Sequence, residues 1–403
     1  MDNKKRLELA DWSIKYSLKC GADESVVSIY NSRDIEIEYR NKKLEKLQES
    51  TQNGLNLQVY LNHKYSSHST NDLRKDSLTK FIEEAVAGTK YLTTDKFRSL
   101  VDPSYYPTNL ALDLKLRDES YEKIDSADRV KLASQIEEAA MAVSDQIISS
   151  TSSYSDSFYE TTRIHSNGFT GESKGTSFSA GAEVTVNDSG GGRPEDYCFV
   201  TTRLRNEIPS AEYLGKEAAQ RALRKIGQKK IESGKYQMLV ENRVSARLLG
   251  MFSGAMTARS IQQKSSFLDG MLGKKIASEK LTLIDDPFIV KGLGSRLYDG
   301  DGIAAKKRVM IDKGVLKNYF IDNYYGKKLG LEPTTSSPSN IVLEYGTKSF
   351  EQLLKEVSKG ILVTGFIGGN SNTTTGDFSF GIIGMLIENG EIIKSVNEMN
   401  ISF

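Results

Sequence analysis

Strict alternation of apolar and polar residues in two short segments constrains this chain most. The segments are Ile35–Tyr39 (IEIEY) and Leu55–Leu61 (LNLQVYL). Because successive side chains of a β-strand point to opposite faces, the alternation predicts strands with one buried and one solvated face. Turn-forming residues follow the two segments, at Asn41–Lys42 and at Asn62–His63. The pattern therefore predicts consecutive strands joined by tight turns.

Helices are predicted on both sides of these strands. Apolar residues recur at helical spacing over residues 4–20, and again in a segment that ends near Gly88. The order predicts an N-terminal α/β domain of αββα type over residues 1–95. Residues 96–125 contain two prolines and no clear period, so we expect a linker there.

A middle region is predicted over residues 126–230. Its first helix is expected to begin after Ser126, whose hydroxyl can cap it. Residues 147–206 are rich in Ser, Thr and Gly with short β-prone pieces, which predicts an antiparallel meander. A second helix is predicted over residues 210–227, with Ser210 as its cap.

The C-terminal domain is predicted over residues 231–403. Apolar residues at 244–258 predict a buried helix, and Ser349 opens a capping box for another helix that Gly360 is expected to close. A hairpin region rich in Gly and Thr follows at residues 368–381. The predicted fold class is therefore α+β: an N-terminal αββα-type unit, followed by a mostly antiparallel, β-rich C-terminal domain with packed helices.

Potential zinc ligands and general bases are scarce. The chain contains three histidines and two cysteines: His63, His68, His165, Cys20 and Cys198. His63 and His68 are five positions apart in a predicted hairpin with no acidic residue between them, which does not match a helical metal pair. His165 lies in a predicted turn and is expected to be exposed. The two cysteines form no CxxC pair.

Charge and hydropathy exclude several classes of protein. Lys and Arg number 54 and Asp and Glu 53, for a net charge of +1, so we expect no direct binding to nucleic acid or to an anionic membrane. No apolar run approaches the roughly 20 residues that span a bilayer. The basic N-terminus has no apolar stretch behind it, so no signal peptide is predicted, and the expected location is the cytoplasm.

Two motifs partly match ligand-binding loops. Residues 368–377 are rich in glycine, but they lack the Gly-Lys-Ser/Thr ending and the following helix of a phosphate-binding loop. Asp299–Gly302 resembles the start of a calcium loop, but Lys306–Arg308 brings positive charge where acidic ligands would be needed. We therefore predict a structural loop and a turn.

The order and spacing of several segments identify a family resemblance. The chain resembles the TldD/PmbA family, the modulators of DNA gyrase classed as peptidase-like (peptidase U62), and in particular its PmbA (TldE) branch. The resemblance runs over essentially the whole chain. The segments that carry it are Lys19–Glu24, Gly54–Tyr60, His165–Gly171, Lys264–Leu268, Leu281–Pro287, Gly376–Ser379 and Ile387–Ile392.

The resemblance implies a two-chain metalloprotease that acts on unfolded or extended peptides, in which the TldD-like subunit carries a His-Glu-x-x-x-His zinc motif. The segment expected to align with that motif is Leu249–Gly254, with Leu249, Gly250 and Gly254 at the key positions, and it contains no His or Glu. The resemblance thus implies a metal-free chain without catalytic residues, with zinc in the TldD-like partner. Isolated, the chain could form a homodimer.

Three further expectations depend on the resemblance. The chain's own contribution would be an interface with its partner and sheet edges that hold a peptide. The glycine-rich loop would form one wall of the cleft between the two subunits, at Gly368, Gly369, Asn370, Thr375, Gly376 and Asp377. Family members continue for several tens of residues, so the domain ending at residue 403 is expected to be truncated and its last strands to lack partners. The alternative function is a non-proteolytic, protein-binding regulator of the gyrase-modulator type.

Overall fold

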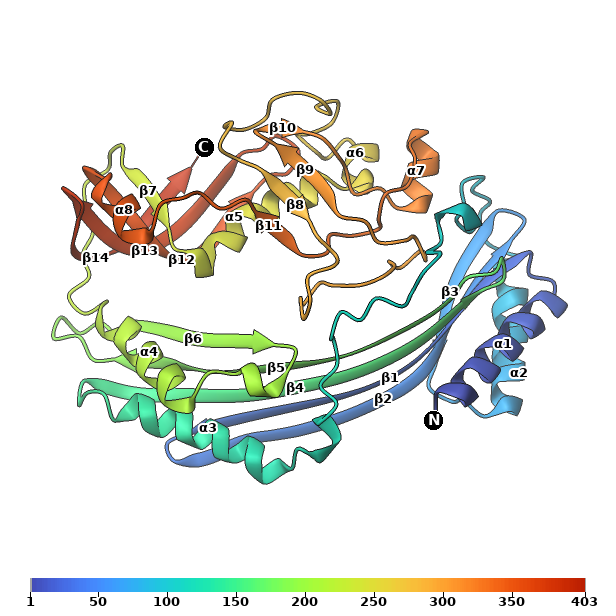
Figure 1. Ribbon diagram of the computed structural model, residues 1–403, viewed down its shortest axis with the longest axis horizontal. Coiled ribbons are helices and arrows are strands. Elements are labelled where there is room, and N and C mark those ends of the chain that lie inside the picture. Colours follow the sequence, from blue (N-terminus) through green and yellow to red (C-terminus); the bar gives the residue numbers. More distant parts are fainter. Residues whose placement is uncertain (1, 403) are drawn as a thin grey trace.

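The computed structural model describes residues 2–402, whose strands form three sheets (Figure 1). A long, curved sheet makes one side of the molecule, and the C-terminal domain with two smaller sheets lies over its concave face. Nearly all strand pairs are antiparallel; the exception among the paired strands described is β7 with β12. This arrangement confirms the predicted α+β class.

The long sheet has six antiparallel strands in the order β3-β2-β1-β4-β5-β6. Their bounds are β1 (Glu24–Arg40), β2 (Lys43–Leu61), β3 (Lys64–Thr70), β4 (Ile147–His165), β5 (Thr170–Val186) and β6 (Glu195–Thr202). The turns at 41–42 and 62–63 are confirmed, and all four of their residues have positive φ. The first three strands and the last three belong to one sheet, because β1 pairs with β4 from Val26 to Arg40.

Two pairs of helices cover the same face of this sheet at its two ends (Figure 1). Their bounds are α1 (Asn3–Lys19), α2 (Lys75–Thr89), α3 (Ser126–Met141) and α4 (Ala211–Leu223). In β1, Val27 and Ile29 pack in the core beneath α1 and α2, while Ile35 and Ile37 pack in the core beneath α3 and α4. Alternate residues of β1 therefore contribute to two separate cores on one face of the sheet. The opposite face of the sheet is directed toward the C-terminal domain.

A buried ion pair fixes α3 on the sheet. Arg129 Nε donates to Asp156 Oδ2 at 2.6 Å, and both side chains are almost fully buried. The hydroxyls of Tyr121 and Tyr154 donate to the same carboxylate, each at 2.8 Å. The carboxylate thus has the charged and neutral donors that a buried anion requires.

The C-terminal domain contains the remaining regular elements. They are β7 (Gln237–Val240), α5 (Asn242–Ala255), α6 (Ala258–Gln262), β8 (Leu283–Asp285), β9 (Arg308–Asp312), β10 (Val315–Leu316), α7 (Asn323–Leu329), β11 (Ile341–Leu343), α8 (Phe350–Lys355), β12 (Lys359–Ser371), β13 (Phe378–Glu388) and β14 (Glu391–Ser402). The sheet orders are β10-β9-β8-β11 and β14-β13-β12-β7, so β14 is an edge strand. Besides its pairing with β13, β14 bridges to Lys229 at Val396.

Residues 96–125 cross from the first helices to α3 with no α-helix or strand of their own. Two short 3-10 turns lie within this stretch, η1 (Pro103–Tyr105) and η2 (Tyr121–Lys123), and a third, η3 (Arg205–Glu207), lies between β6 and α4. In the described part of the chain, no helix combines the length and the apolar character that crossing a membrane requires.

Several local predictions are corrected. Asp125, not Ser126, caps α3, since its carboxylate accepts from Asp128 N at 2.8 Å. The cap of α4 by Ser210 and the capping box of Ser349 are confirmed. Gly360 does not close α8, which ends at Lys355, because Gly360 already belongs to β12.

The region predicted as short strands and the helix predicted as buried also differ from expectation. The antiparallel meander is confirmed, but β4 has 19 residues and β5 has 17. Because many residues of these strands are Ser, Thr or Gly, the sequence shows no apolar alternation that would indicate such long strands. In α5 only Val244 and Ala255 are fully buried, because its Leu248 and Met251 pack on the β12 sheet while its opposite side stays open.

Candidate functional site

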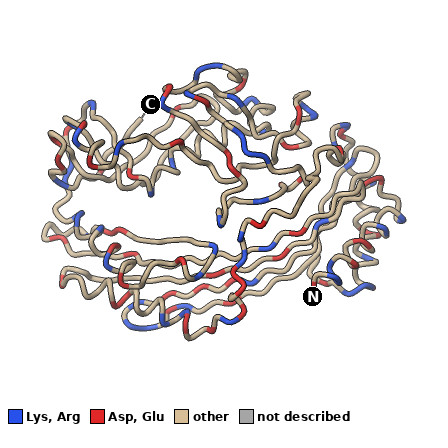
Figure 2. The backbone as a smooth tube through the Cα atoms, viewed as in Figure 1, with Lys and Arg blue, Asp and Glu red and all other residues tan. Residues whose placement is uncertain are grey.

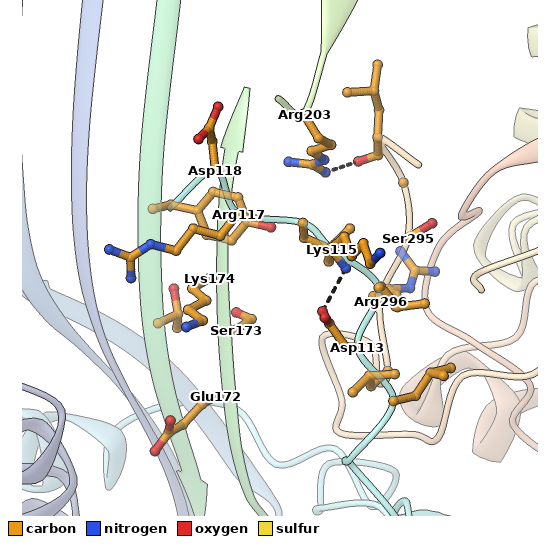
Figure 3. A pocket seen from close by; sticks show the side chains of 18 of the residues that line it. Asp113, Lys115, Arg117, Asp118, Glu172, Ser173, Lys174, Arg203, Ser295 and Arg296 are labelled. Atoms are coloured by element: carbon orange, nitrogen blue, oxygen red, sulfur yellow. Dashed lines mark hydrogen bonds between the residues drawn. The ribbon is translucent and has the colours of Figure 1, made fainter. Parts of the chain in front are cut away.

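A large cleft lies between the concave face of the long sheet and the C-terminal domain (Figure 3). Its volume is about 1410 Å³. Five chain segments line it: residues 112–120 of the linker, 159–163 of β4, 172–174 of β5, 203–206 after β6, and the loop 293–300. Segments distant in sequence therefore build this site together, so no single motif could have revealed it.

Arginines tie the two sides of the cleft together. Arg203, which is nearly buried, donates to the carbonyls of Thr176 on β5 and of Gly292 and Leu293 on the opposite loop. Arg163 of β4 donates to Ser28 Oγ and to the carbonyl of Gly300. These bonds hold the loop at a fixed distance from the sheet, so the cleft is a preformed feature of the fold.

Both signs of charge line the cleft. Arg117 pairs with Glu160 at 3.2 Å, and Lys174 lies 4.0 Å from Glu119. Figure 2 shows Lys and Arg intermixed with Asp and Glu over all parts of the backbone. The cleft therefore presents a mixed polar lining and no field of one sign.

A second, smaller hollow lies farther along the same face of the sheet. Its volume is about 410 Å³, and hydroxyls dominate its lining. The serines that line it are Ser50, Ser153, Ser155, Ser157, Ser177 and Ser179. Both hollows use β4 and β5: serines line the smaller hollow, and larger polar side chains such as Tyr159, Arg163 and Lys174 line the large cleft.

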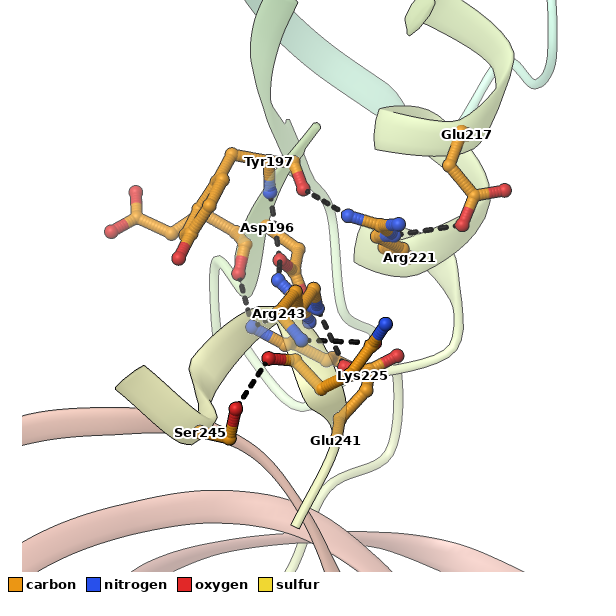
Figure 4. A network of polar contacts seen from close by, with 10 residues as sticks. Asp196, Tyr197, Glu217, Arg221, Lys225, Glu241, Arg243 and Ser245 are labelled. Atoms are coloured by element: carbon orange, nitrogen blue, oxygen red, sulfur yellow. Dashed lines mark hydrogen bonds and ion pairs between the residues drawn. The ribbon is translucent and has the colours of Figure 1, made fainter. Parts of the chain in front are cut away.

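An ion-pair network joins β6 of the long sheet to α5 of the C-terminal domain (Figure 4). Asp196 of β6 lies 3.0 Å from Lys225 Nζ and accepts from both terminal nitrogens of Arg243, in the first turn of α5. Burial alone would raise the pKa of Asp196, but Lys225 and Arg243 hold it below its usual value. Lys225 is itself buried within this network.

The glycine-rich hairpin between β12 and β13 lies away from the large cleft. Gly369 and Asn370 line a separate hollow of about 460 Å³ on the β12-β13-β14 sheet. Gly376 lies at the tip against the Phe267 ring, and Thr375 Oγ1 donates to Asp377 Oδ2 at 2.6 Å. Gly368 adopts a φ of 62° beside a β-bulge. The geometry is that of a structural turn, as predicted; a wall of a cleft shared with a partner stays a prediction.

The expected position of the lost zinc motif lies in a regular part of α5. Leu249 is half-buried in the C-terminal core, while Gly250 and Gly254 are exposed with open space around them. None of the three carries a donor atom in its side chain, so they do not fit a metal ion. Over residues 2–402, no group of three or more His, Cys, Asp or Glu side chains is arranged to hold a metal.

The prediction that His165 is exposed is wrong. It ends β4 and is 3% exposed, packed against Tyr106 and Phe169, because the linker and the loop around Gly302 cover it. Burial lowers its pKa to about 3, and Arg163 acts in the same direction. Its Nδ1 lies 3.1 Å from Tyr106 Oη, whose proton goes to Asn167. His165 is thus a neutral, structural group.

The other predicted motifs resolve into local structure. Asp299 Oδ1 accepts from the backbone N–H groups of Asp301 and Ile303, each at 2.9 Å, which confirms the turn at residues 299–302. His63 lies in its predicted turn, and His68 meets the Phe81 ring edge-on.

Comparisons with known protein families match nearly the whole chain. The models of the PmbA/TldA metallopeptidase domains match in order: domain 1 over residues 26–88, the central domain over 119–226 and the C-terminal domain over 233–403. Metalloprotease PmbA of Escherichia coli O157:H7 is 28% identical over 94% of this chain and 84% of its own length. A Haemophilus influenzae PmbA homologue is 26% identical over 98% and 87%.

Solved structures agree. A protein from Bacteroides thetaiotaomicron, described as a modulator of DNA gyrase, is 42% identical with a TM-score of 0.96, over 100% of this chain and 92% of its own. One from Thermotoga maritima with the same description is 25% identical, with a TM-score of 0.88, over 98% and 91%. TldE from Thermococcus kodakarensis, at 22% identity and a TM-score of 0.85 over 98% and 91%, shares the fold. The chain therefore belongs to the PmbA/TldD family of metalloproteases.

Proposed function

We propose that this chain is a metal-free, non-catalytic subunit of PmbA/TldE type. In this proposal it assembles in the cytoplasm with a zinc-bearing TldD-like subunit, and the pair degrades or processes unfolded and extended peptides. The observation that carries the proposal is the side-chain composition of α5 at the positions expected for the zinc motif. At Leu249, Gly250 and Gly254 it has neither a group that could bind zinc nor a carboxylate that could deprotonate a bound water.

The concave face supports the same proposal. The cleft and the hydroxyl-lined hollow run along β4 and β5, and the serines of the smaller hollow leave room for a polypeptide backbone. The arginine contacts across the cleft hold it open without any ligand. A preformed groove lowers the ordering cost of binding a flexible peptide.

The test is reconstitution. The purified chain is mixed with a family member from the same genome that carries His-Glu-x-x-x-His, and cleavage of an unfolded peptide is followed by mass spectrometry. We expect cleavage only by the mixture, lost on adding 1,10-phenanthroline, and lost when the motif Glu of the partner is replaced by Gln. Chelator-sensitive cleavage by this chain alone would refute the proposal.

A non-proteolytic, protein-binding regulator is the second candidate. It is favoured by the description of the two solved structures from Bacteroides and Thermotoga as modulators of DNA gyrase. Co-purification of a gyrase subunit with this chain, together with no cleavage in the reconstituted mixture, would favour this candidate over the first.

A further inference from the structure

Part of the edge of β5 lies open inside the large cleft. The backbone groups of its even-numbered residues point away from β4, as two contacts show: Val186 N donates to Pro194 O, and Thr176 N donates to Leu116 O, each at 2.9 Å. β6 pairs with β5 only from Phe178 to Thr185. From Thr170 to Ser177, this edge of β5 is therefore not covered by a strand.

The linker uses only one residue of this remaining edge. Thr176 is satisfied on both sides, since its N–H donates to the Leu116 carbonyl and its own carbonyl accepts from Arg203 at 3.0 Å. Lys174 and Glu172 come next on the same edge. Within residues 2–402, their outward N–H and C=O groups have no hydrogen-bond partner, and both residues are exposed.

The open edge faces the cleft. Glu172, Ser173 and Lys174 all line it, and Figure 3 shows them on one side with Ser295 and Arg296 of the loop on the opposite side. Residues 170–175 of an extended strand span about 20 Å. The fixed loop 293–300 opposite leaves the cleft volume of about 1410 Å³ free beside this edge.

We propose that this edge of β5, at Glu172 and Lys174, binds an extended polypeptide by strand addition. Backbone N–H and C=O groups that alternate along a strand edge are matched by another extended backbone, and this chain already satisfies the neighbouring residues of the same edge with β6 and with the linker. Because the flanking side chains carry both signs of charge, recognition is through the peptide backbone and tolerates many sequences.

The inference builds on the peptide substrate of the proposed function, and it locates where this chain holds that peptide. The two can fail separately. Cleavage by the reconstituted pair could proceed without this edge, and this edge could bind peptides in a chain that never assists cleavage.

Hydrogen–deuterium exchange of the full-length chain is the first test. The probe is the oxidised B chain of insulin, an extended peptide, added to 1 mM. We expect the amides of Glu172 and Lys174, in fragments that cover residues 170–176, to exchange at least fivefold more slowly with the probe. Unchanged exchange in these fragments, or protection confined to the exposed edge strand β14, overturns the proposal.

A matched pair of variants is the second test. Lys174→Pro removes an N–H that points outward and is unpaired, so the β4 ladder keeps its hydrogen bonds, while Lys174→Ala removes only the side chain. We expect the dissociation constant of the labelled probe to rise about fivefold in Lys174→Pro, as loss of one net hydrogen bond implies, and to change less than twofold in Lys174→Ala. Equal dissociation constants for the two variants overturn the proposal, and melting curves verify that both remain folded.

Discussion

The guanidinium of Arg243 donates two hydrogen bonds to the carboxylate of Asp196, at 3.1 and 3.2 Å, and so ties α5 to the edge strand β6 of the long sheet. Asp196 is almost completely buried, and Lys225 provides its second ion pair. The two contacts join the domain that carries α5 to the sheet that forms the floor of the cleft. Three predictions about stability follow from such buried polar groups, and two from glycines.

Arg243→Met is expected to destabilise the protein by about 2 kcal/mol. Methionine keeps an unbranched apolar stem but leaves Asp196 buried with one ion-pair partner in place of two. Urea denaturation followed by circular dichroism measures the change. The control is Lys230→Ala, which breaks an ion pair with Glu398 whose two side chains are mostly exposed, and which is expected to cost less than about 0.5 kcal/mol. Similar losses in both variants would contradict the prediction.

Asp301→Asn is expected to stabilise the protein at neutral pH. Burial raises the pKa of Asp301 to about 6, and the neighbouring Asp299 carboxylate acts in the same direction. Since the folded state holds this proton more tightly than the unfolded state, the group opposes folding increasingly as pH rises from about 4 to 6. The amide has no proton to lose, and its oxygen can still accept from Asn323 N.

The expected gain at pH 8 is about 1 to 2 kcal/mol, after allowance for the partial exposure of Asp301. Urea denaturation at pH 5 and pH 8 measures it, with Asp145→Asn at an exposed position as the control. A gain that is the same at both pH values would show that protonation of Asp301 is not its cause.

His165→Leu is expected to reduce the loss of stability in acid. Because burial lowers the pKa of His165 to about 3, the unfolded chain binds a proton near pH 6.5 that the folded chain does not. The wild type should lose about 2 kcal/mol between pH 6.5 and pH 5 through this group, and the variant should lose none of it. Unfolding free energies at the two pH values test this, with His63→Asn at an exposed position as the control.

The extent of sequence-based success follows from how local each feature is. The turns at Asn41 and Asn62 and the caps at Ser210 and Ser349 were predictable, because each depends on a few adjacent residues. The lengths of β4 and β5 were not, because serines and glycines give no apolar alternation even when one face is buried. The burial of His165 depends on the linker and on residues near Gly302, more than 130 positions away.

The cleft shows the same limit. The roles of Arg163 and Arg203 could not be predicted from the sequence, because neither residue lies in a motif. Each acts by donating to carbonyls of a distant loop. The open edge of β5 is visible only once β6 is known to stop opposite Phe178. The family resemblance, by contrast, could be recognised from the sequence, because it depends on the order of many short segments.

Gly369→Ala is expected to destabilise the C-terminal sheet by about 2 to 3 kcal/mol. A Cβ atom at Gly369 would lie 2.2 Å from the Phe380 ring, and its φ of 130° disfavours any L side chain. The matched control is Gly368→Ala, which also has a positive φ but open space around it, so about 1 kcal/mol is expected from conformation alone. Thermal unfolding of both variants measures the difference, and an equal or larger loss in Gly368→Ala would contradict the role of Phe380.

Gly250→Ala and Gly254→Ala are each expected to stabilise the protein by about 0.5 to 1 kcal/mol. Both glycines lie inside α5 with helical backbone and nothing within 4 Å of a built Cβ, so alanine adds helix propensity without a clash. Gly215→Ala in α4 is the opposite control, because its Cβ would lie 2.4 Å from the Ile136 carbonyl of α3 and should cost at least about 2 kcal/mol. Urea denaturation of dilute protein separates the three variants. Loss of stability in Gly250→Ala or Gly254→Ala would mean that this side of α5 is covered in solution, and sedimentation of the wild type would then identify a second copy of the chain as the cover.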